Sequence, residues 1–295
     1  MDQGVTMAST KPISPSLIAV MDKSATPNRL GQHVIRRAKL FEGRVTYLAS
    51  AAHKELAKET GDAFEALYPA AAARSAASAI AGVGVRDRSP EIRETHLDAI
   101  VQARTAAGSS GDEALALIGD EVVELLDLAF ERMPGWREIA EGTISVTEFR
   151  QQYLHSAAAG LHVIANCIAA ARIAKVPVPE VLDALVEIPW RRDALQTEAP
   201  PKDGSTDLTD QKLPALHRFF EGTLAKTVWD ERARSWRSSA SGATRAGYES
   251  AINRVLHHIC KEHPELKAIA SDDTFTELGL IARKRKPGRP KKTAE

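Results

Sequence analysis

Alanine at helical spacing limits the fold of this chain more than any other feature. Of its 295 residues, 48 are alanine and only 5% are aromatic. Alanine has the highest helix propensity, and β-branched residues here rarely show the alternation of a strand. We therefore expect an all-α fold, made of a helical domain, a smaller C-terminal helical part and a disordered basic tail.

Capping signals divide this pattern into separate helices. Ser145 and Glu148 fit the capping box, and a stripe of apolar residues from Phe149 to Ile168 predicts one helix behind it. Ser89 before Pro90 is typical of another helix N-terminus. Further helices are expected over residues 45–60, 62–81 with a break at 68–69, 90–105, 112–133, 178–188 and 244–262, with a last short helix at 274–277.

Stretches rich in proline and glycine mark the expected boundaries. Residues 191–213 contain two adjacent prolines and almost nothing apolar, as is typical of a linker or a long surface loop. The expected segments are an extended N-terminal arm at 1–30, a helical domain at 31–190, the linker at 191–213, a C-terminal helical part at 214–270, and a short helix with the basic tail at 271–295.

Several classes of protein are disfavoured by what the sequence lacks. No run approaches the ~18 apolar residues of a membrane-spanning helix, and residues 1–10 lack the pattern of a signal peptide. We therefore expect a cytoplasmic protein without membrane contact. There is no glycine-rich phosphate loop and no nucleophile elbow, so neither an enzyme nor a bound cofactor is expected.

The cysteines and histidines carry little chemical signal. Cys167 and Cys260 lie in apolar helical patterns, which argues against a disulfide framework and a reactive thiol. His257, Cys260 and His263 follow at spacings of three, which turns the third side chain away from the first, so no metal site is expected. His155 and His162 are expected to share one helix face and to have a packing or surface role, and not an acid–base role.

The charge is divided unevenly along the chain. The 39 basic and 39 acidic residues balance overall, but without residues 283–295 the remainder has 32 basic and 38 acidic residues. A mildly acidic body thus carries a basic tail suited to a polyanion. The basic residues of this tail are Arg283, Lys284, Arg285, Lys286, Arg289, Lys291 and Lys292.

The centre of the tail, Pro287-Gly288-Arg289-Pro290, resembles the AT-hook, which lies along the minor groove of A·T-rich DNA. Gly288 permits a close backbone approach, the prolines hold the chain extended, and Arg289 can enter the narrow groove. Pro287 stands where the commonest core has its first arginine, so low affinity is expected of this hook. The alternative is a polycation without sequence preference.

A second basic segment runs from Trp229 to Arg237. Tryptophan interleaved with arginine suits stacking and phosphate contact, so Arg234 and Arg237 are expected to contact DNA. The alternative is that Trp229 and Trp236 anchor C-terminal helices in the core while the arginines face solvent. We favour a buried Trp236 with both arginines directed to DNA.

Three short segments also match the pattern of one protein family. They are Phe41-Glu42-Gly43-Arg44, Trp136-Arg137 with Tyr153-Leu154-His155, and Trp229-Asp230-Glu231-Arg232. Over about residues 11–262 they resemble the C-terminal helical part of the DndB family, regulators of DNA sulfur modification (phosphorothioation). The resemblance implies transcriptional repression of the modification genes. Family members begin with a ParB-like α/β domain carrying Asp-Gly-Gln-His-Arg, which is not expected here, and Gly31-Gln32-His33 is interpreted as coincidence.

Together these features predict a DNA-binding regulatory or accessory protein in a DNA-modification or restriction setting, associated with the nucleoid. Its partner would be A·T-rich DNA, bound in the minor groove by residues 283–292. The alternative is a protein-interaction scaffold held on the nucleoid by a non-specific tail. The sequence does not determine the oligomeric state, and a homo-oligomer is one of the possible assemblies.

Overall fold

Helices make up most of the structure, a computed structural model that describes residues 29–47, 59, 65–83, 90–105, 110–192, 194–196, 217, 219–232, 234–240 and 244–280. Almost all of the expected N-terminal arm, and the tail from residue 281 onward, lie outside the described residues. The helices are α2 (Arg29–Arg37), α4 (Ala70–Ile80), α5 (Pro90–Thr105), α6 (Gly111–Arg132), α7 (Trp136–Ala140), α8 (Val146–Gln152), α9 (Ala158–Ala174), α10 (Val178–Val186), α11 (Arg245–Glu262) and α12 (Asp272–Glu277). Short 3₁₀ helices are η1 (Lys39–Phe41), η3 (Leu154–Ser156) and η6 (Pro264–Ala270).

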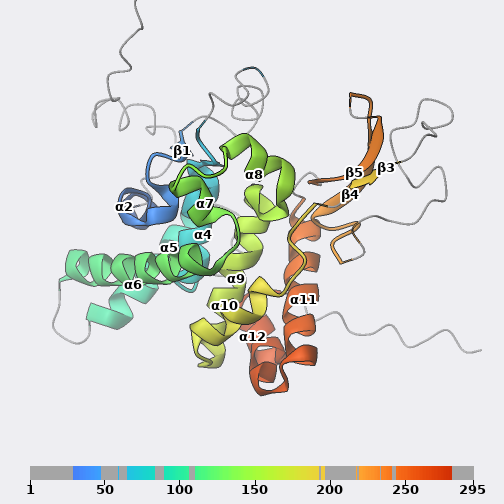
Figure 1. Ribbon diagram of the computed structural model, residues 1–295. Coiled ribbons are helices and arrows are strands. Elements are labelled where there is room, and N and C mark those ends of the chain that lie inside the picture. The colour runs from blue at the N-terminus through green and yellow to red at the C-terminus, as the bar shows by residue number, and fades with distance from the viewer. Residues whose placement is uncertain are drawn as a thin grey trace, which may run out of the picture.

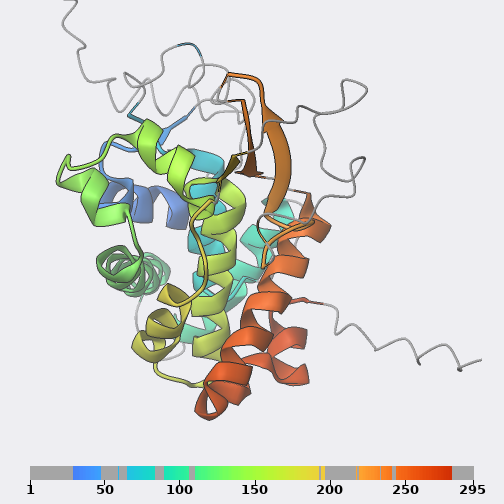
Figure 2. The ribbon, with the colours of Figure 1, turned by 45° about the vertical axis from the view of Figure 1, so that its right-hand side comes forward.

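Helix α9 is the central element of the core. Twelve of its 17 residues are buried, as expected of a helix that is apolar on all sides. The alanine-rich α4 packs on it, and so do α10 and α11. In Figures 1 and 2, α9 lies between the N-terminal helices and α11. One cluster of buried apolar residues extends from Leu30 to Leu280 and joins these layers.

The capping signals of the sequence are confirmed where the structure describes them. The Ser145 hydroxyl accepts a hydrogen bond from the backbone N–H of Glu148 (3.1 Å), whose carboxylate accepts one from Ser145 N–H (2.7 Å). Ser110 and Glu113 form a second capping box at the start of α6. The expected mainly helical fold is confirmed, with α5, α6, α11 and α12 close to their expected bounds.

Two small sheets were not expected in this fold. β1 (Val45–Thr46) pairs in parallel with β2 (Tyr68–Pro69), so the helix expected from Val45 is wrong at its start. β4 (Ala225–Asp230) and β5 (Ser235–Ala240) form an antiparallel hairpin, and β3 (Ala194–Gln196) pairs with β5. The expected C-terminal helical part therefore contains a hairpin, and the expected linker contains a strand. Figure 1 shows this sheet beside the beginning of α11, on the side away from α2 and α6.

The helix expected to run from residue 146 through residue 168 is wrong as a single element. It divides into α8, η3 and α9. The backbone N–H of Leu154 donates to the Trp190 carbonyl (2.9 Å), and the Ser156 hydroxyl donates to the Tyr153 carbonyl (2.6 Å). These bonds replace the helical pattern at the break, so His155 and His162 lie on different elements and not on one helix face.

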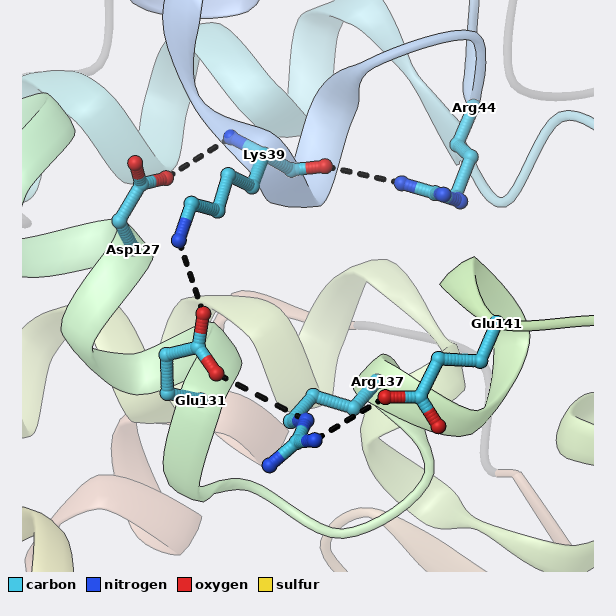
Figure 3. A network of polar contacts seen from close by, with 6 residues as sticks. All are labelled: Lys39, Arg44, Asp127, Glu131, Arg137 and Glu141. Carbon is cyan, nitrogen blue, oxygen red and sulfur yellow. Dashed lines mark hydrogen bonds and ion pairs between the residues drawn. The ribbon is translucent and has the colours of Figure 1, made fainter.

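A polar network ties η1 to α6 and α7 (Figure 3). The backbone N–H of Lys39 donates to Asp127 (2.8 Å) and its ammonium group to Glu131 (2.8 Å). Glu131 also lies 3.7 Å from the guanidinium of Arg137. The side chains of this network are largely exposed to solvent, so each ion pair adds little stability. The network mainly fixes how η1 approaches α6.

Candidate nucleic-acid interface

The outer face of the β3–β5–β4 sheet carries one of the two arginines predicted to contact DNA. Side chains alternate along β4 and β5, so Trp229 and Trp236 point inward while Lys226 and Arg237 lie on the other, exposed face. Trp236 is buried, as the favoured interpretation expected, but it lies in a strand and not in a helix. Lys226 joins this face only because the segment is a strand, so it was not predicted to contact DNA.

Arg234 lies at the end of the hairpin and is exposed. Its φ of 47° is in the left-handed region, which residues other than glycine adopt at a cost. The Asp230 carboxylate accepts a hydrogen bond from the backbone N–H of Arg232 (3.0 Å) and shapes this turn. Within the described part of the chain, neither Arg232 nor Arg234 makes an ion pair, so both guanidinium groups are available to an anion.

The charge of Arg237 acts on a second arginine, Arg192, that was not predicted from the sequence. The Arg237 guanidinium lies 2.9 Å from the Asp230 carboxylate and is about half exposed. Arg192, just before β3, is mostly buried, and this burial together with the charge of Arg237 lowers its pKa to about 10.

The charge of the hairpin favours contact with phosphates. Residues 225–240 contain four basic and two acidic residues, and the outer ends of the basic side chains reach solvent. One of the two carboxylates, Asp230, is engaged by Arg237 and by the turn. Arginine and lysine side chains arranged in this way contact the sugar-phosphate backbone and position a protein on DNA, without reading its sequence.

The indole rings of Trp229 and Trp236 pack together on the inner face of the hairpin. The rings of Trp229 and Trp236 meet edge to face with centroids 5.5 Å apart, and they form a buried cluster of their own, separate from the main core. The indole N–H groups of both, and the hydroxyl of Ser238, are buried without a hydrogen-bond partner among the described residues. Each such group costs free energy, which offsets part of the stability that the indole contact gives the hairpin.

The tail residues predicted to bind DNA lie outside the described residues. They are Arg283, Lys284, Arg285, Lys286, Pro287, Gly288, Arg289, Pro290, Lys291 and Lys292. The predicted DNA contacts therefore fall into two groups, and the structure describes only the group on the hairpin.

Three residues from one of the segments behind the family resemblance, Trp136, Tyr153 and His155, come together in an aromatic cluster. His155 is fully buried between the rings of Trp136, Phe149, Tyr153 and Trp190, at centroid distances of 5.1–5.4 Å. The Trp136 indole donates to the Tyr68 hydroxyl (3.2 Å), which donates to the His155 carbonyl (2.6 Å). This cluster closes the break between α8 and α9 and has the contacts of a packing element.

His257, His263 and the two cysteines also lie in packing or surface contacts and not in a reactive site. His257 stacks on Phe275, while His263 lies 3.0 Å from Glu187. Burial raises the pKa values of the Cys167 and Cys260 thiols, which disfavours the reactive thiolate. Across the part of the chain that the structure describes, no three such side chains are grouped to hold a metal ion.

His33, which lies in α2, packs against α6. Its Nε2 lies 2.7 Å from the Asp120 carboxylate of α6, and its ring covers Gly119, where a Cβ atom would collide with it. The Gly31-Gln32-His33 segment therefore lies on a helix that packs against α6.

Among the described helices, none has both the length and the apolar character needed to cross a membrane. No family model matches the chain, and no curated protein or solved structure matches it significantly. The resemblance to the DndB family and its implications thus stay predictions.

Proposed function

We propose that this chain is a DNA-binding regulatory or accessory protein whose C-terminal tail occupies the minor groove of A·T-rich DNA. The observation that carries the proposal is the Pro287-Gly288-Arg289-Pro290 core between two groups of lysine and arginine. Arg289 enters the groove, where A-tracts concentrate negative potential, and the flanking cations contact phosphates. The regulated process is proposed to be DNA sulfur modification.

The hairpin supplies the second set of contacts in this proposal. A hook with one groove-inserted arginine binds weakly by itself. When the tail is bound, the body is held near the same duplex, and Arg234 and Arg237 meet phosphates at a high effective concentration. Support comes from the exposure of both guanidinium groups and from the absence, within the described residues, of an ion pair at Arg234.

A gel-shift series tests the proposal directly. The full chain and a variant ending at residue 282 are titrated onto A·T-rich and G·C-rich duplexes of equal length at several salt concentrations. Loss of the tail is expected to weaken binding to both duplexes and to abolish the preference for A·T-rich DNA. Equal binding of both duplexes by the full chain would instead favour a scaffold with a non-specific tail. Unchanged affinity after truncation would show that residues 1–282, and not the tail, bind DNA.

A further inference from the structure

A pocket of about 410 Å³ lies where three segments distant in sequence meet. They are the turn after η1 (residues 42–44), Glu65 before β2, and the stretch from α7 to the start of α8 (residues 139–146). The Arg44 carbonyl accepts hydrogen bonds from the backbone N–H groups of Leu67 (2.6 Å) and Tyr68 (3.1 Å), which fixes the first segment to the second. Small-molecule sites commonly have volumes of about 300–1,000 Å³, so this pocket is large enough for a small ligand.

Two glycines of the lining keep part of the pocket open. Gly43 (φ 68°) and Gly142 (φ 72°) are both in the left-handed region, which favours glycine. A Cβ atom added at either position would meet nothing within 4 Å. The space beside these two turns is therefore not filled by neighbouring side chains.

Arg44 brings to the pocket a cation whose charge is only partly compensated. Its side chain is partly buried, and one of its N–H groups donates to the Lys39 carbonyl (2.8 Å; Figure 3). Within the described part of the chain, this guanidinium makes no ion pair. Burial lowers the pKa of Arg44 more than the neighbouring charge of Glu42 raises it, as expected of a cation that has lost hydration without gaining a close carboxylate. A guanidinium has several N–H donors, so donors remain for an anion in the pocket.

The rest of the lining is acidic on one part and apolar on another. The carboxylates of Glu42 and Glu65 are exposed, and neither forms an ion pair with another described residue. The apolar part consists of Ile139, Ile144 and Val146. An anion alone would leave both carboxylates without a partner, and an amine alone would leave the guanidinium without one. The complementary ligand therefore carries both charges and an apolar group.

We infer that this pocket binds a free α-amino acid with an apolar side chain. Its carboxylate would accept hydrogen bonds from the guanidinium of Arg44 and from the hydroxyl of Ser145, which also lines the pocket. Its ammonium group would donate to Glu42 or Glu65, and its side chain would contact the apolar part of the lining. The site is independent of the proposed DNA contacts.

Isothermal titration calorimetry of the full chain tests this inference. Leucine, isoleucine, methionine and phenylalanine are titrated separately, and saturable binding of at least one is expected. Isocaproate lacks the ammonium group of leucine, and isoamylamine lacks its carboxylate. Each should bind about tenfold or more weakly than leucine, because one charge-assisted contact is lost. Absence of saturable binding by all four amino acids, or equal binding of leucine and either analogue, would overturn the inference.

Matched variants place the ligand in the pocket. Arg44→Gln is expected to weaken amino-acid binding about tenfold or more, while Arg36→Gln, which removes an exposed cation on α2, should not. The double variant with glutamine at Glu42 and Glu65 should also bind more weakly, with Glu124→Gln, an exposed carboxylate of α6, as its control. Unchanged affinity in the Arg44 variant or in the double glutamate variant would overturn the inference.

The test remains decisive if Arg44→Gln does not fold. Glu42 and Glu65 are exposed, so the double glutamate variant keeps its fold and still reports on the ammonium contact. In amide NMR spectra of the unmodified chain, the bound amino acid should shift the signals of Gly43 and Gly142, which line the pocket. Saturable binding that leaves both glycine signals unmoved would overturn the inference.

Discussion

The indole of Trp236 on β5 stands directly opposite that of Trp229 on β4, and the two rings meet edge to face at 5.5 Å. This pair is the whole of the second buried cluster among the described residues. The hairpin that presents Arg234 and Arg237 therefore depends on one aromatic contact more than on the main core.

We expect Trp236→Ala to loosen the hairpin selectively. Truncation of a buried tryptophan costs about 3–5 kcal/mol, and here the loss falls on a cluster outside the main core. Hydrogen exchange should show reduced protection of the β4 and β5 amides, with α9 unaffected. Trp236→Phe, which keeps an aromatic contact, serves as the control. Unchanged protection in Trp236→Ala would contradict this role of the indole pair.

Replacement of Arg234 and Arg237 together by glutamine is expected to weaken DNA binding with little change in Tm. The one ion pair lost, with Asp230, is partly exposed and contributes at most about 1 kcal/mol. Each lost phosphate contact should reduce the slope of log affinity against log salt by about 0.9. Gel shifts over a salt series measure this slope, with Arg36→Gln as the control. Unaltered affinity in the folded double variant would exclude the hairpin from the interface.

The hairpin could not be predicted from the sequence because its turn lacks the usual signal. Two-residue hairpin turns favour Asn-Gly or Gly residues, whereas this turn runs through Glu231 to Arg234 and places an arginine at positive φ. Thr227 and Trp229 are buried and alternate with exposed Lys226, as in a strand, but this pattern is too short to predict a strand by itself. The helices with capping residues were predictable, since their signals are local.

The break before α9 illustrates the other limit of sequence reasoning. The apolar spacing from residue 149 to 168 fits one helix. In the structure, however, the N–H of Leu154 donates a hydrogen bond to the Trp190 carbonyl, and the His155 carbonyl accepts one from the Tyr68 hydroxyl. Both partners are distant in sequence, so tertiary contacts override the local pattern.

We expect Gly160→Ala to destabilise the protein at this break. A Cβ atom there would collide with the backbone of His155 and lie 2.8 Å from the Leu154 carbonyl oxygen. The matched control is Gly111→Ala in α6, where a Cβ atom meets nothing within 4 Å and alanine favours the helix. Thermal unfolding should show a clear loss of Tm for the first variant and none for the second. Equal Tm values would contradict the packing at the break.

Stability should fall as the pH is lowered from about 6.5 toward 4. Burial lowers the pKa of His155 to about 3 and that of His162 to about 4. Between these values and the unfolded value near 6.5, the unfolded chain binds more protons than the folded one, so acid favours unfolding. His263, whose pKa is raised by Glu187, acts in the opposite direction but is exposed.

Urea unfolding at several pH values measures this dependence. The slope of the unfolding free energy against pH should correspond to as many as two protons taken up on unfolding. His155→Gln removes one of the two titrating groups while an amide N–H can still reach the Pro134 carbonyl, which His155 Nε2 contacts at 2.9 Å. The slope in this variant should fall by about half. An unchanged slope would show that His155 does not titrate with unfolding.

Arg289→Ala is expected to remove the preference for A·T-rich DNA and to leave most of the non-specific affinity. The guanidinium of Arg289 is the one group of the Pro287–Pro290 core that can enter the narrow groove, whereas the flanking cations meet phosphates in any sequence. Lys292→Ala is the matched control, because it removes a positive charge outside that core. Competition gel shifts with the two duplexes should show lost discrimination in Arg289→Ala and retained discrimination in Lys292→Ala. Equal effects of the two changes would show that the tail acts as a polycation without sequence preference. Any preference for A·T-rich DNA would then have to come from the rest of the chain.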